Sequence, residues 1–280
     1  SMRPEPLAIT AYTLTNALGR GCAASLAGLL GGESGLCRCD LDYVDFPTWI
    51  GRVAGLENEP LPGDLGEYDC RNNRLARVGL AQDGFESAVA EARARHGAGR
   101  VGLFLGTSTS GMEHLEACYR RREARGGGPL GPELRFQYTH AMNSLGSFCR
   151  RVLGLRGPAC VVSTACSSSV KVFAAAYRYI AAGVCDAAVV GVVSAEPCAP
   201  WDRFRNGISI GEGAGFALLE RGGEAADPRL LGYGESSDAY HMSAPHPEGA
   251  GAAQAMAAAL RCAGVSADDI DYVNYLDYIA

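Results

Sequence analysis

The chain alternates between short apolar runs and longer segments in which apolar residues recur at helical spacing. Short apolar runs bounded by turn residues predict buried strands, whereas recurrence at every third or fourth residue predicts amphipathic helices. Strands are predicted over Leu7–Leu14, Val101–Leu105, Ala159–Ser163, Ala187–Val193, Leu230–Gly234 and Tyr272–Tyr275, with a strand pair at Ile208–Ile210 and Phe216–Glu220. Helices are predicted over Cys22–Leu30, Asn73–Arg95, Met112–Arg125, His140–Leu153, Val170–Ala182 and Ala252–Cys262, with residues 40–65 irregular. This alternation indicates an α/β architecture with buried strands.

One cysteine stands between a predicted strand and a predicted helix. Cys166 follows the β-branched pair Val161–Val162 and precedes three serines, Ser167–Ser169. Serine is a poor residue inside a helix but a good one at its start, where hydroxyls satisfy free N–H groups. The thiol is therefore expected at the positive end of a helix dipole, which favours the nucleophilic thiolate, and the Cys166 backbone N–H is expected to hold a developing oxyanion. The alternative is a small, buried and inert cysteine, the usual state of such residues.

Composition narrows the class of protein. The chain has 280 residues, 48% of them hydrophobic and 20% charged, with a net charge of −6 and 11 cysteines. These values leave ample material for a core and argue against nucleic acid as the main partner. Many cysteines without a secretory signal indicate reduced thiols in a cytoplasm. No membrane-spanning run, P-loop, dinucleotide fingerprint or zinc-ligand spacing is found in the sequence, so we expect no metal.

Four motifs follow one another in order from the cysteine towards the end of the chain. They are Ser163-Thr-Ala-Cys-Ser-Ser-Ser169, Gly183-Val-Cys-Asp-Ala-Ala-Val-Val-Gly191, the stretch from Pro200-Trp-Asp to Gly211-Glu-Gly-Ala-Gly215, and Ser236-Ser-Asp-Ala-Tyr-His-Met-Ser-Ala-Pro245 followed by Gly249-Ala-Gly251. Together they resemble the β-ketoacyl-[acyl carrier protein] synthases, the condensing enzymes of fatty-acid and polyketide synthesis, over nearly the whole chain.

The resemblance implies a fold and an assembly. The family has a thiolase-like, five-layered α-β-α-β-α fold built from two similar halves. Residues 1–280 would then form one ketosynthase domain, with the N-terminal half complete over about residues 1–200 and the C-terminal half only begun over about residues 201–280. In the family the strand that matches Ala159–Ser163 pairs with its own copy across a two-fold axis, so a homodimer is expected.

The resemblance also implies a reaction, that of an acyltransferase acting as a 3-oxoacyl-[acyl carrier protein] synthase. Cys166 would accept an acyl group from an acyl carrier protein and condense it with a malonyl thioester by decarboxylative Claisen chemistry. Both substrates would be carried on the carrier's phosphopantetheine, with no other cofactor. Thr109, in the loop Gly106–Gly111, would line the acyl tunnel, while His241 and Ser243 would lie near the substrate, with Ser243 against the phosphopantetheine arm.

The sequence departs from the family in two places. The family's two catalytic histidines, its lysine and the glycine-rich loop of the oxyanion hole are missing, because Asp271–Asn274 is followed by Tyr275–Ala280 instead of the His-Gly-Thr motif. The segment Val190–Cys198 is also shorter than in family members. The sequence could belong to a longer protein, to a truncated one, or to a degenerate homologue that does not condense. The first two are favoured, because a degenerate homologue would more often have lost Cys166 as well.

Two other functions stay open. One is a non-catalytic partner subunit of the chain-length-factor type, and the other is a cysteine-based acyl hydrolase that uses His241. The remaining histidines are each expected to be surface or hydrogen-bonding residues. Glu212 is expected to tie loops together, and Lys171, five residues after Cys166, is off the helical face that could reach the thiol.

Overall fold

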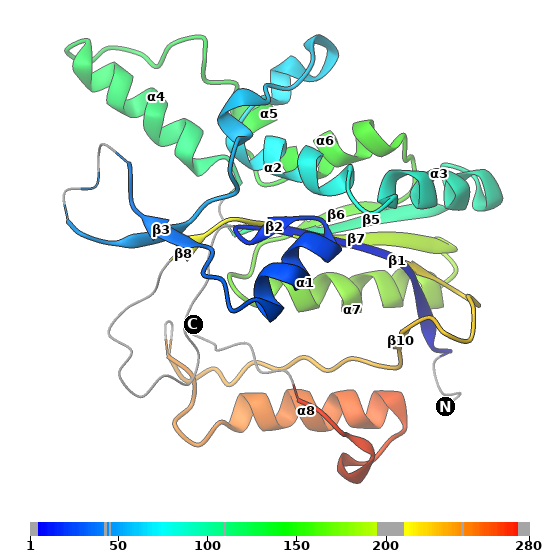
Figure 1. Ribbon diagram of the computed structural model, residues 1–280. Helices are drawn as coiled ribbons and strands as arrows, with labels where there is room; N and C mark the ends of the chain where they lie inside the picture. Colours follow the sequence, from blue (N-terminus) through cyan, green and yellow to red (C-terminus); the bar gives the residue numbers. More distant parts are fainter. Residues whose placement is uncertain are drawn as a thin grey trace.

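A mixed sheet forms the centre of the molecule (Figure 1). The computed structural model describes residues 5–41, 44, 46–108, 110–194, 210–241 and 244–273. The strand order is β10-β1-β9-β7-β5-β6, with β2 beside β1. β5 pairs in parallel with β6 and β7, whereas β9 runs antiparallel to β7 and β1. The strands are β1 (Leu7–Asn16), β2 (Gly19–Arg20), β5 (Val101–Gly106), β6 (Ala159–Val162), β7 (Ala187–Ser194), β9 (Gly213–Glu220) and β10 (Arg229–Leu230).

Helices cover both faces of this sheet because side chains alternate along its strands. Leu103 and Leu105 of β5 belong to a core shared with α2 (Arg71–Leu80), α3 (Phe85–His96) and α6 (Ser144–Leu153). Phe104, between them, belongs to a second core on the opposite face, under α7 (Ser168–Ala181). A strand buried on both sides is what the continuous apolar run at Val101–Leu105 predicts.

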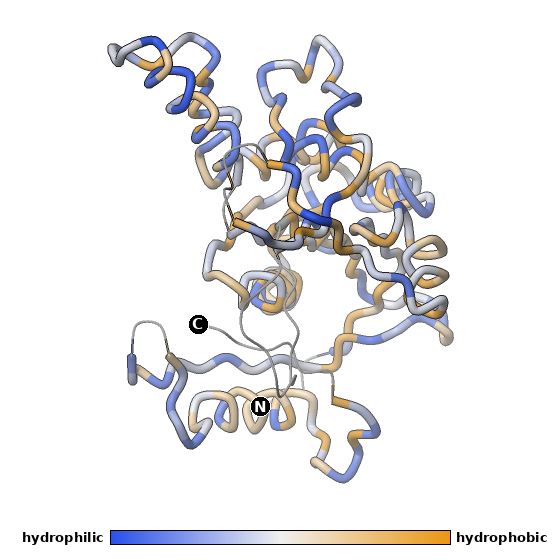
Figure 2. The backbone as a smooth tube through the Cα atoms, turned by 60° about the vertical axis from the view of Figure 1, so that its left-hand side comes forward, coloured by the Kyte–Doolittle hydropathy of each residue, from blue (hydrophilic) through white to orange (hydrophobic). Residues whose placement is uncertain are grey.

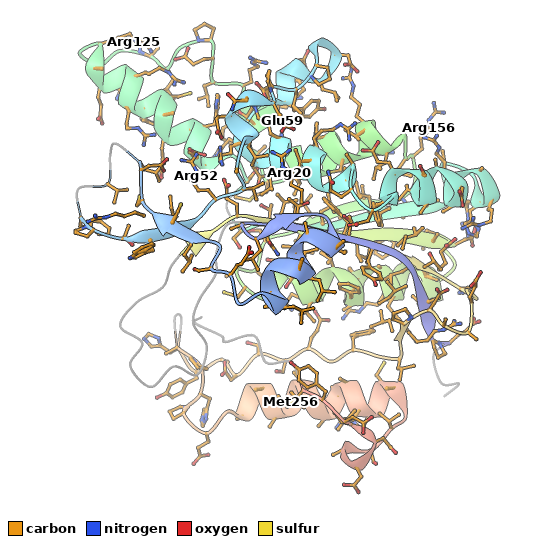
Figure 3. The ribbon with its side chains drawn as sticks, viewed as in Figure 1. Arg20, Arg52, Glu59, Arg125, Arg156 and Met256 are labelled. Atoms are coloured by element: carbon orange, nitrogen blue, oxygen red, sulfur yellow. The ribbon has the colours of Figure 1, made fainter. Side chains whose placement is uncertain are left out.

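Smaller elements surround these layers. A second sheet joins β3 (Leu36–Arg38), β4 (Trp49–Gly51) and β8 (Ile210–Gly211), and 3₁₀ turns lie at Leu56–Asn58, Gly63–Tyr68 and Ala267–Asp269. An ion pair of 2.6 Å between Arg20 and Glu59, both labelled in Figure 3, joins β2 to the segment after β4. The other helices are α1 (Cys22–Leu30), α4 (Met112–Ala124), α5 (Phe136–Thr139) and α8 (Ala250–Ala263), of which α4 projects from the body in Figure 1.

The order of layers matches the expected thiolase-like fold. Below α7 in Figure 1 an extended segment leads away from β10, and α8 lies beneath it. Tyr177 of α7 contacts Tyr233 with ring centroids 5.5 Å apart, whereas Ser236 donates a hydrogen bond to the Gly251 carbonyl of α8. The segment is therefore held between two helices. The predicted α/β class is confirmed, and helices lie on both sides of the sheet.

The predicted helix over Asn73–Arg95 is wrong, since the chain forms two helices there. Asp83 and Gly84 both have left-handed backbones, with φ of 54° and 70°, between the end of α2 and the start of α3. A continuous helix cannot contain this geometry. The apolar spacing persisted across the break because both helices pack on the same face of the sheet.

Several other boundaries also differ from the sequence predictions. The helix predicted from His140 begins at Ser144, and the strand predicted over Leu230–Gly234 covers only Arg229–Leu230. β8 and β9 are not a pair, because β8 joins β4 in the small sheet and β9 lies in the central one. Tyr272 and Val273 are not in a strand. Residues 208, 209, 274 and 275 lie outside the described part of the chain. The remaining predicted strands and helices are confirmed to within a few residues.

The strand that leads to Cys166 is less buried than its sequence predicted. Ala159 is exposed and the rest of β6 is half-buried. β6 pairs with β5 on one side and forms the end of the central sheet among the described residues. An apolar strand at a sheet edge needs a covering partner in a stable assembly.

Candidate active site

Cys166 lies on the short turn between β6 and α7, as the sequence predicted. β6 ends at Val162 and α7 begins at Ser168, and the Cys166 side chain is exposed. The Thr107 N–H donates to the Val162 carbonyl at 3.1 Å, so the ends of β5 and β6 are joined where the turn begins. A thiol at this position lies next to the free N–H groups of a helix start, which stabilise negative charge.

The serines after Cys166 act differently from the capping role expected of them. Ser167, the N-cap residue of α7, makes no side-chain capping hydrogen bond. Instead, the Ser168 hydroxyl accepts a hydrogen bond from the Thr164 N–H at 2.8 Å and donates one to the Ala165 carbonyl at 2.7 Å. The Ser167 hydroxyl donates to the Thr164 carbonyl at 2.8 Å. The hydroxyls therefore fix the turn that carries the thiol.

The backbone just before the thiol is strained. Ala165 has a φ of 50°, in the left-handed region that residues with a Cβ rarely adopt. Such strain persists only where surrounding contacts determine it, and it concentrates at functional sites. The conformation of Ala165 thus indicates a functional site at this turn, independently of the presence of Cys166.

The loop that follows β5 has a similar construction. The Thr107 hydroxyl accepts a hydrogen bond from the Ser110 N–H at 3.1 Å, and Ser110 has a φ of 51°. The Ser110 hydroxyl lies 3.3 Å from that of Ser144, at the start of α6, and both serines are buried. Thr109 itself, the residue predicted to line the acyl tunnel, lies outside the described residues.

The other predicted substrate residues are placed only in part. His241 is exposed, beyond the extended segment that follows β10, and Ser243 lies outside the described residues. The structure therefore tests neither role, and both stay predictions.

The remaining histidines have structural contacts. His96 Nε2 lies 3.0 Å from Glu220, and His114 Nε2 lies 3.1 Å from the Glu133 carbonyl. The His140 ring contacts that of Phe136 in a tilted arrangement, with ring centroids 4.9 Å apart. His246 Nδ1 accepts a hydrogen bond from the Glu248 N–H at 3.2 Å. His96, His114 and His246 are thus hydrogen-bonding residues, as expected, whereas the Nδ1 atom of His140 is buried without a hydrogen-bond partner.

Glu212 and Lys171 both have structural partners. The Glu212 carboxylate accepts hydrogen bonds from the Arg71 guanidinium and, at 2.8 Å, from the Val53 N–H, which ties the small sheet to α2. The Lys171 ammonium lies 3.0 Å from Glu235, which also pairs with Arg178. Lys171 and Arg178 therefore both join α7 to the extended segment that contains Glu235.

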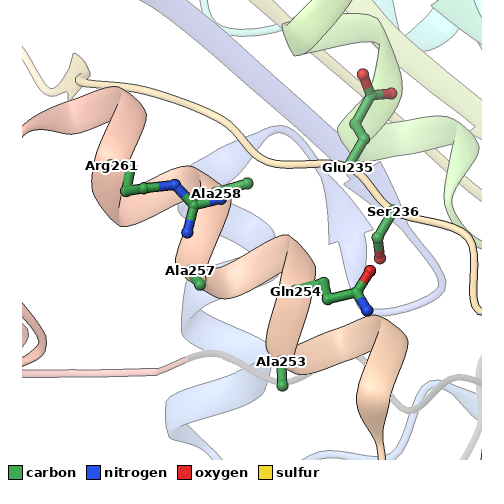
Figure 4. Close-up of a pocket in the computed structure, with 7 residues that line it drawn as sticks. All are labelled: Glu235, Ser236, Ala253, Gln254, Ala257, Ala258 and Arg261. Carbon is green, nitrogen blue, oxygen red and sulfur yellow. The ribbon is translucent and has the colours of Figure 1, made fainter.

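A shallow groove of about 480 Å³ runs along α8 (Figure 4). Glu235 points away from α8 in this view, towards α7, whereas Ser236 and Gln254 approach each other across the groove. The groove is lined by Glu235, Ser236, Ala253, Gln254, Ala257, Ala258 and Arg261. Three alanines of α8 line it together with two charged and two polar residues.

Several other thiols are unfavourable nucleophiles. Burial raises the pKa of Cys70 and of Cys185 to about 11, and it raises the pKa of Cys149 further still. Burial, followed by the nearby Asp83 carboxylate, also raises the pKa of Cys22. A raised pKa leaves little thiolate at neutral pH. Within the described part of the chain, no three His, Cys, Asp or Glu side chains gather as a metal site would require.

Comparison with known proteins agrees with this geometry. The model of the β-ketoacyl synthase N-terminal domain matches residues 76–196, and that of the C-terminal domain matches residues 229–277. A ketosynthase, ApeO, solved in complex with its chain length factor, ApeC, from Xenorhabdus doucetiae shares 34% identity and a TM-score of 0.83, over 95% of this chain and 70% of that chain. The fold and the two domain models define a condensing enzyme of the thiolase type. The chain belongs to the β-ketoacyl synthase family.

Curated relatives point the same way. The 3-oxoacyl-[acyl-carrier-protein] synthase 2 of Vibrio cholerae is 29% identical over 98% of this chain and 73% of its own length. The chloroplastic 3-oxoacyl-[acyl-carrier-protein] synthase I of Hordeum vulgare is 28% identical over 95% of this chain and 65% of its own length. A β-ketoacyl synthase structure from Burkholderia phymatum, with 22% identity and a TM-score of 0.78, supports the fold.

Proposed function

We propose that the protein is a 3-oxoacyl-[acyl carrier protein] synthase whose nucleophile is Cys166. The observation that carries this proposal is the exposed thiol on a strained strand-to-helix turn at the start of α7. Its family membership supplies the reaction class, and the turn supplies the residue. No other described cysteine lies at the start of a helix of comparable length and is exposed as well.

In the first step the Cys166 thiolate attacks the carbonyl carbon of an acyl thioester. The carrier's phosphopantetheine thiol leaves, and an acyl-enzyme thioester remains. The Cys166 backbone N–H, close to the positive end of α7, is proposed to stabilise the oxyanion that forms during the attack. The residues of this chain that would take part in this step lie at the Cys166 turn and the start of α7.

In the second step a malonyl thioester loses CO₂ and its C2 carbanion attacks the acyl carbonyl. The Cys166 thiolate leaves and takes up a proton, and a 3-oxoacyl thioester is released. The family uses histidines here, and none of the five histidines of this sequence stands in the family's Asn-x-His-Gly-Thr motif. Acyl transfer to Cys166 is therefore the step whose reacting residue can be named in this chain.

The partners follow from the reaction. We propose an acyl carrier protein as the donor, with acyl and malonyl groups on phosphopantetheine, and a homodimer formed along β6. The half-exposed apolar edge of β6 supports the dimer, since a two-fold partner would extend the sheet. Of the described cysteines, Cys22, Cys37, Cys39, Cys70, Cys118, Cys149, Cys160, Cys185 and Cys262 are reduced thiols, which supports a reducing cytoplasm. No described helix could cross a membrane.

The remaining substrate contacts are proposals as well. Thr109 would line the acyl tunnel, and His241 and Ser243 would contact the substrate arm. The chain would divide near residue 200 into a complete and a partial half, which the ranges of the two family models support. Thr109→Phe should then shorten the acyl chains that the enzyme accepts, and an unchanged chain-length profile would count against this role.

Intact-mass spectrometry after incubation with an acyl carrier protein thioester tests the main proposal. The expected result is an acyl adduct that maps to Cys166 and is absent from Cys166→Ala. Turnover to free acid, abolished by His241→Ala, would instead identify a hydrolase. Complete absence of an adduct would identify a non-catalytic partner of the chain-length-factor type. Adding the malonyl carrier and measuring CO₂ release then separates acyl transfer from condensation.

A further inference from the structure

The turn before Cys166 holds an alanine in a conformation that alanine disfavours. At a φ of 50° the Ala165 Cβ approaches its own carbonyl oxygen, a contact that glycine avoids. Asp83, another left-handed residue, has a side chain that accepts hydrogen bonds from Thr13 and Cys22. Alanine has no such group, so contacts from elsewhere must hold it in place.

Ser168 supplies these contacts. Its hydroxyl accepts from the Thr164 N–H at 2.8 Å and donates to the Ala165 carbonyl at 2.7 Å, so the two hydrogen bonds bracket the Thr164–Ala165 peptide. Ser168 is 1% exposed, whereas the two neighbouring serines are only half-buried. Buried hydrogen bonds are costly to break, because water cannot replace them.

The two hydrogen bonds of Ser168 are fixed to β5, the strand that pairs with β6. A Cβ built on Gly106, the last residue of β5, would lie 3.0 Å from the Ser168 carbonyl carbon. The Ser168 backbone therefore rests directly on Gly106. The strained turn is thus connected through one buried residue, Ser168, to a fully buried strand.

We propose that Ser168 is a positioning residue, whose hydroxyl holds Ala165 in its left-handed conformation and thereby fixes the Cys166 thiol at the start of α7. This rests on the proposed role of Cys166 as nucleophile. Ser168 contacts the backbone of the turn and is buried from solvent. Its effect on the reaction passes through Ala165.

A double-mutant cycle tests this link. Ser168→Ala should slow the alkylation of Cys166 by iodoacetamide by about tenfold or more, because the turn relaxes and the thiol leaves its position. Ala165→Gly alone should change the rate by less than about threefold, since glycine adopts the same conformation unaided. The double variant Ala165→Gly/Ser168→Ala should return to within about threefold of the unmodified rate. A simple loss of packing would not be rescued in this way.

Two outcomes would overturn the proposal: an unchanged rate in Ser168→Ala, or a double variant no faster than Ser168→Ala. If Ser168→Ala does not fold, the test uses the double variant alone. The proposal then requires that the double variant folds and that its Cys166 is alkylated at the normal rate. A double variant that does not fold overturns the proposal. Ser25→Ala, which removes another buried serine hydroxyl from α1, is the control and should leave the rate unchanged.

The cycle is independent of acyl transfer. If Cys166→Ala still accepts acyl groups, the proposed function fails. The energetic coupling between positions 165 and 168 can still be measured from the alkylation rate of Cys166. If acyl transfer needs Cys166 but the cycle shows no coupling, the positioning role alone is rejected.

Discussion

Ser168 packs directly against Gly106 through its carbonyl group and its Cβ, so the start of α7 and the end of β5 are in direct contact. Gly106→Ala would place a methyl group 3.0–3.1 Å from three atoms of Ser168. We expect a loss of about 1–3 kcal/mol in the free energy of unfolding, measured by urea titration, together with slower alkylation of Cys166. Gly99→Ala, where no heavy atom lies within 4 Å of the added carbon, is the matched control.

Cys166 should be the first thiol to react with iodoacetamide near neutral pH. It is exposed at a helix start, whereas burial raises the pKa of Cys70, Cys149 and Cys185. Peptide mapping after brief treatment measures the order of labelling. The exposed Cys37 is the internal comparison, and faster labelling of Cys37 than of Cys166 would contradict the prediction.

The ion pairs of Glu235 should make the attachment of the extended segment sensitive to acid. Burial acts to raise the pKa of this carboxyl, but Arg178 and Lys171 outweigh it and hold the pKa below its ordinary value of 4.5. A depressed pKa means that the unfolded chain binds the proton more tightly, so this stabilisation is complete above pH 4.5 and is lost as the pH falls through the folded pKa.

Glu235→Gln should therefore destabilise the protein by about 0.5–1 kcal/mol at pH 7, after allowance for solvent screening, and by less below pH 4.5. Urea titrations of both proteins at several pH values measure the difference. A difference that stays constant down to the acid limit would show that the ion pairs do not contribute.

A charge on β6 should disrupt assembly. Val161→Asp places a carboxylate on the edge that we propose forms the dimer, whose buried area should be on the order of 2,000 Å² or more. Sedimentation should show a dimer for the unmodified protein and a monomer or aggregate for the variant. Val184→Asp adds the same charge at an exposed position after α7 and should leave the dimer intact. An unmodified protein that sediments as a stable monomer at micromolar concentration would refute the dimer.

Asp83 should matter for stability although it lies in a break between helices. Its carboxylate accepts hydrogen bonds from the Thr13 hydroxyl at 2.8 Å and from the Cys22 N–H, the first residue of α1, at 3.0 Å. Asp83→Ala should cost about 1–2 kcal/mol, as the loss of a helix cap does, measured by thermal or urea unfolding. Glu91→Ala, at an exposed position of α3, should change stability by less than about 0.5 kcal/mol.

Asp83 also shows why the sequence predicted this region only in part. Periodicity located the apolar face of α2 and α3 correctly, because one sheet face buries both. It did not reveal the break, since the Asp83–Gly84 turn is stabilised by groups 61 and 70 residues away in the chain. The same limit applies to β6, whose apolar residues read as buried although the strand lies at a sheet edge.

The position of Cys166 on a turn between a strand and a helix was predicted correctly, because its signals are local. A β-branched run, a small residue, a cysteine and serines occupy consecutive positions, and they form a strand, a turn and a helix start. The sequence did not indicate that Ser168 faces inwards or that Gly106 lies beneath it. Those facts depend on the pairing of β5 with β6, which joins residues more than fifty positions apart. The one feature of the sequence that could have indicated this contact is Gly106, a glycine at the end of a buried strand.

The position of α8 at the outside of the molecule has a consequence for its local unfolding. Its one buried residue is Gly251, Met256 (labelled in Figure 3) is half exposed to solvent, and the pale orange tube of α8 in Figure 2 lies apart from the central body. A helix that buries so little opens at a lower free energy than the strands of a core. Its amides should exchange with deuterium well before those of β5 and β7, so that α8 and its segment detach as a cooperative unit while the turn that carries Cys166 stays folded.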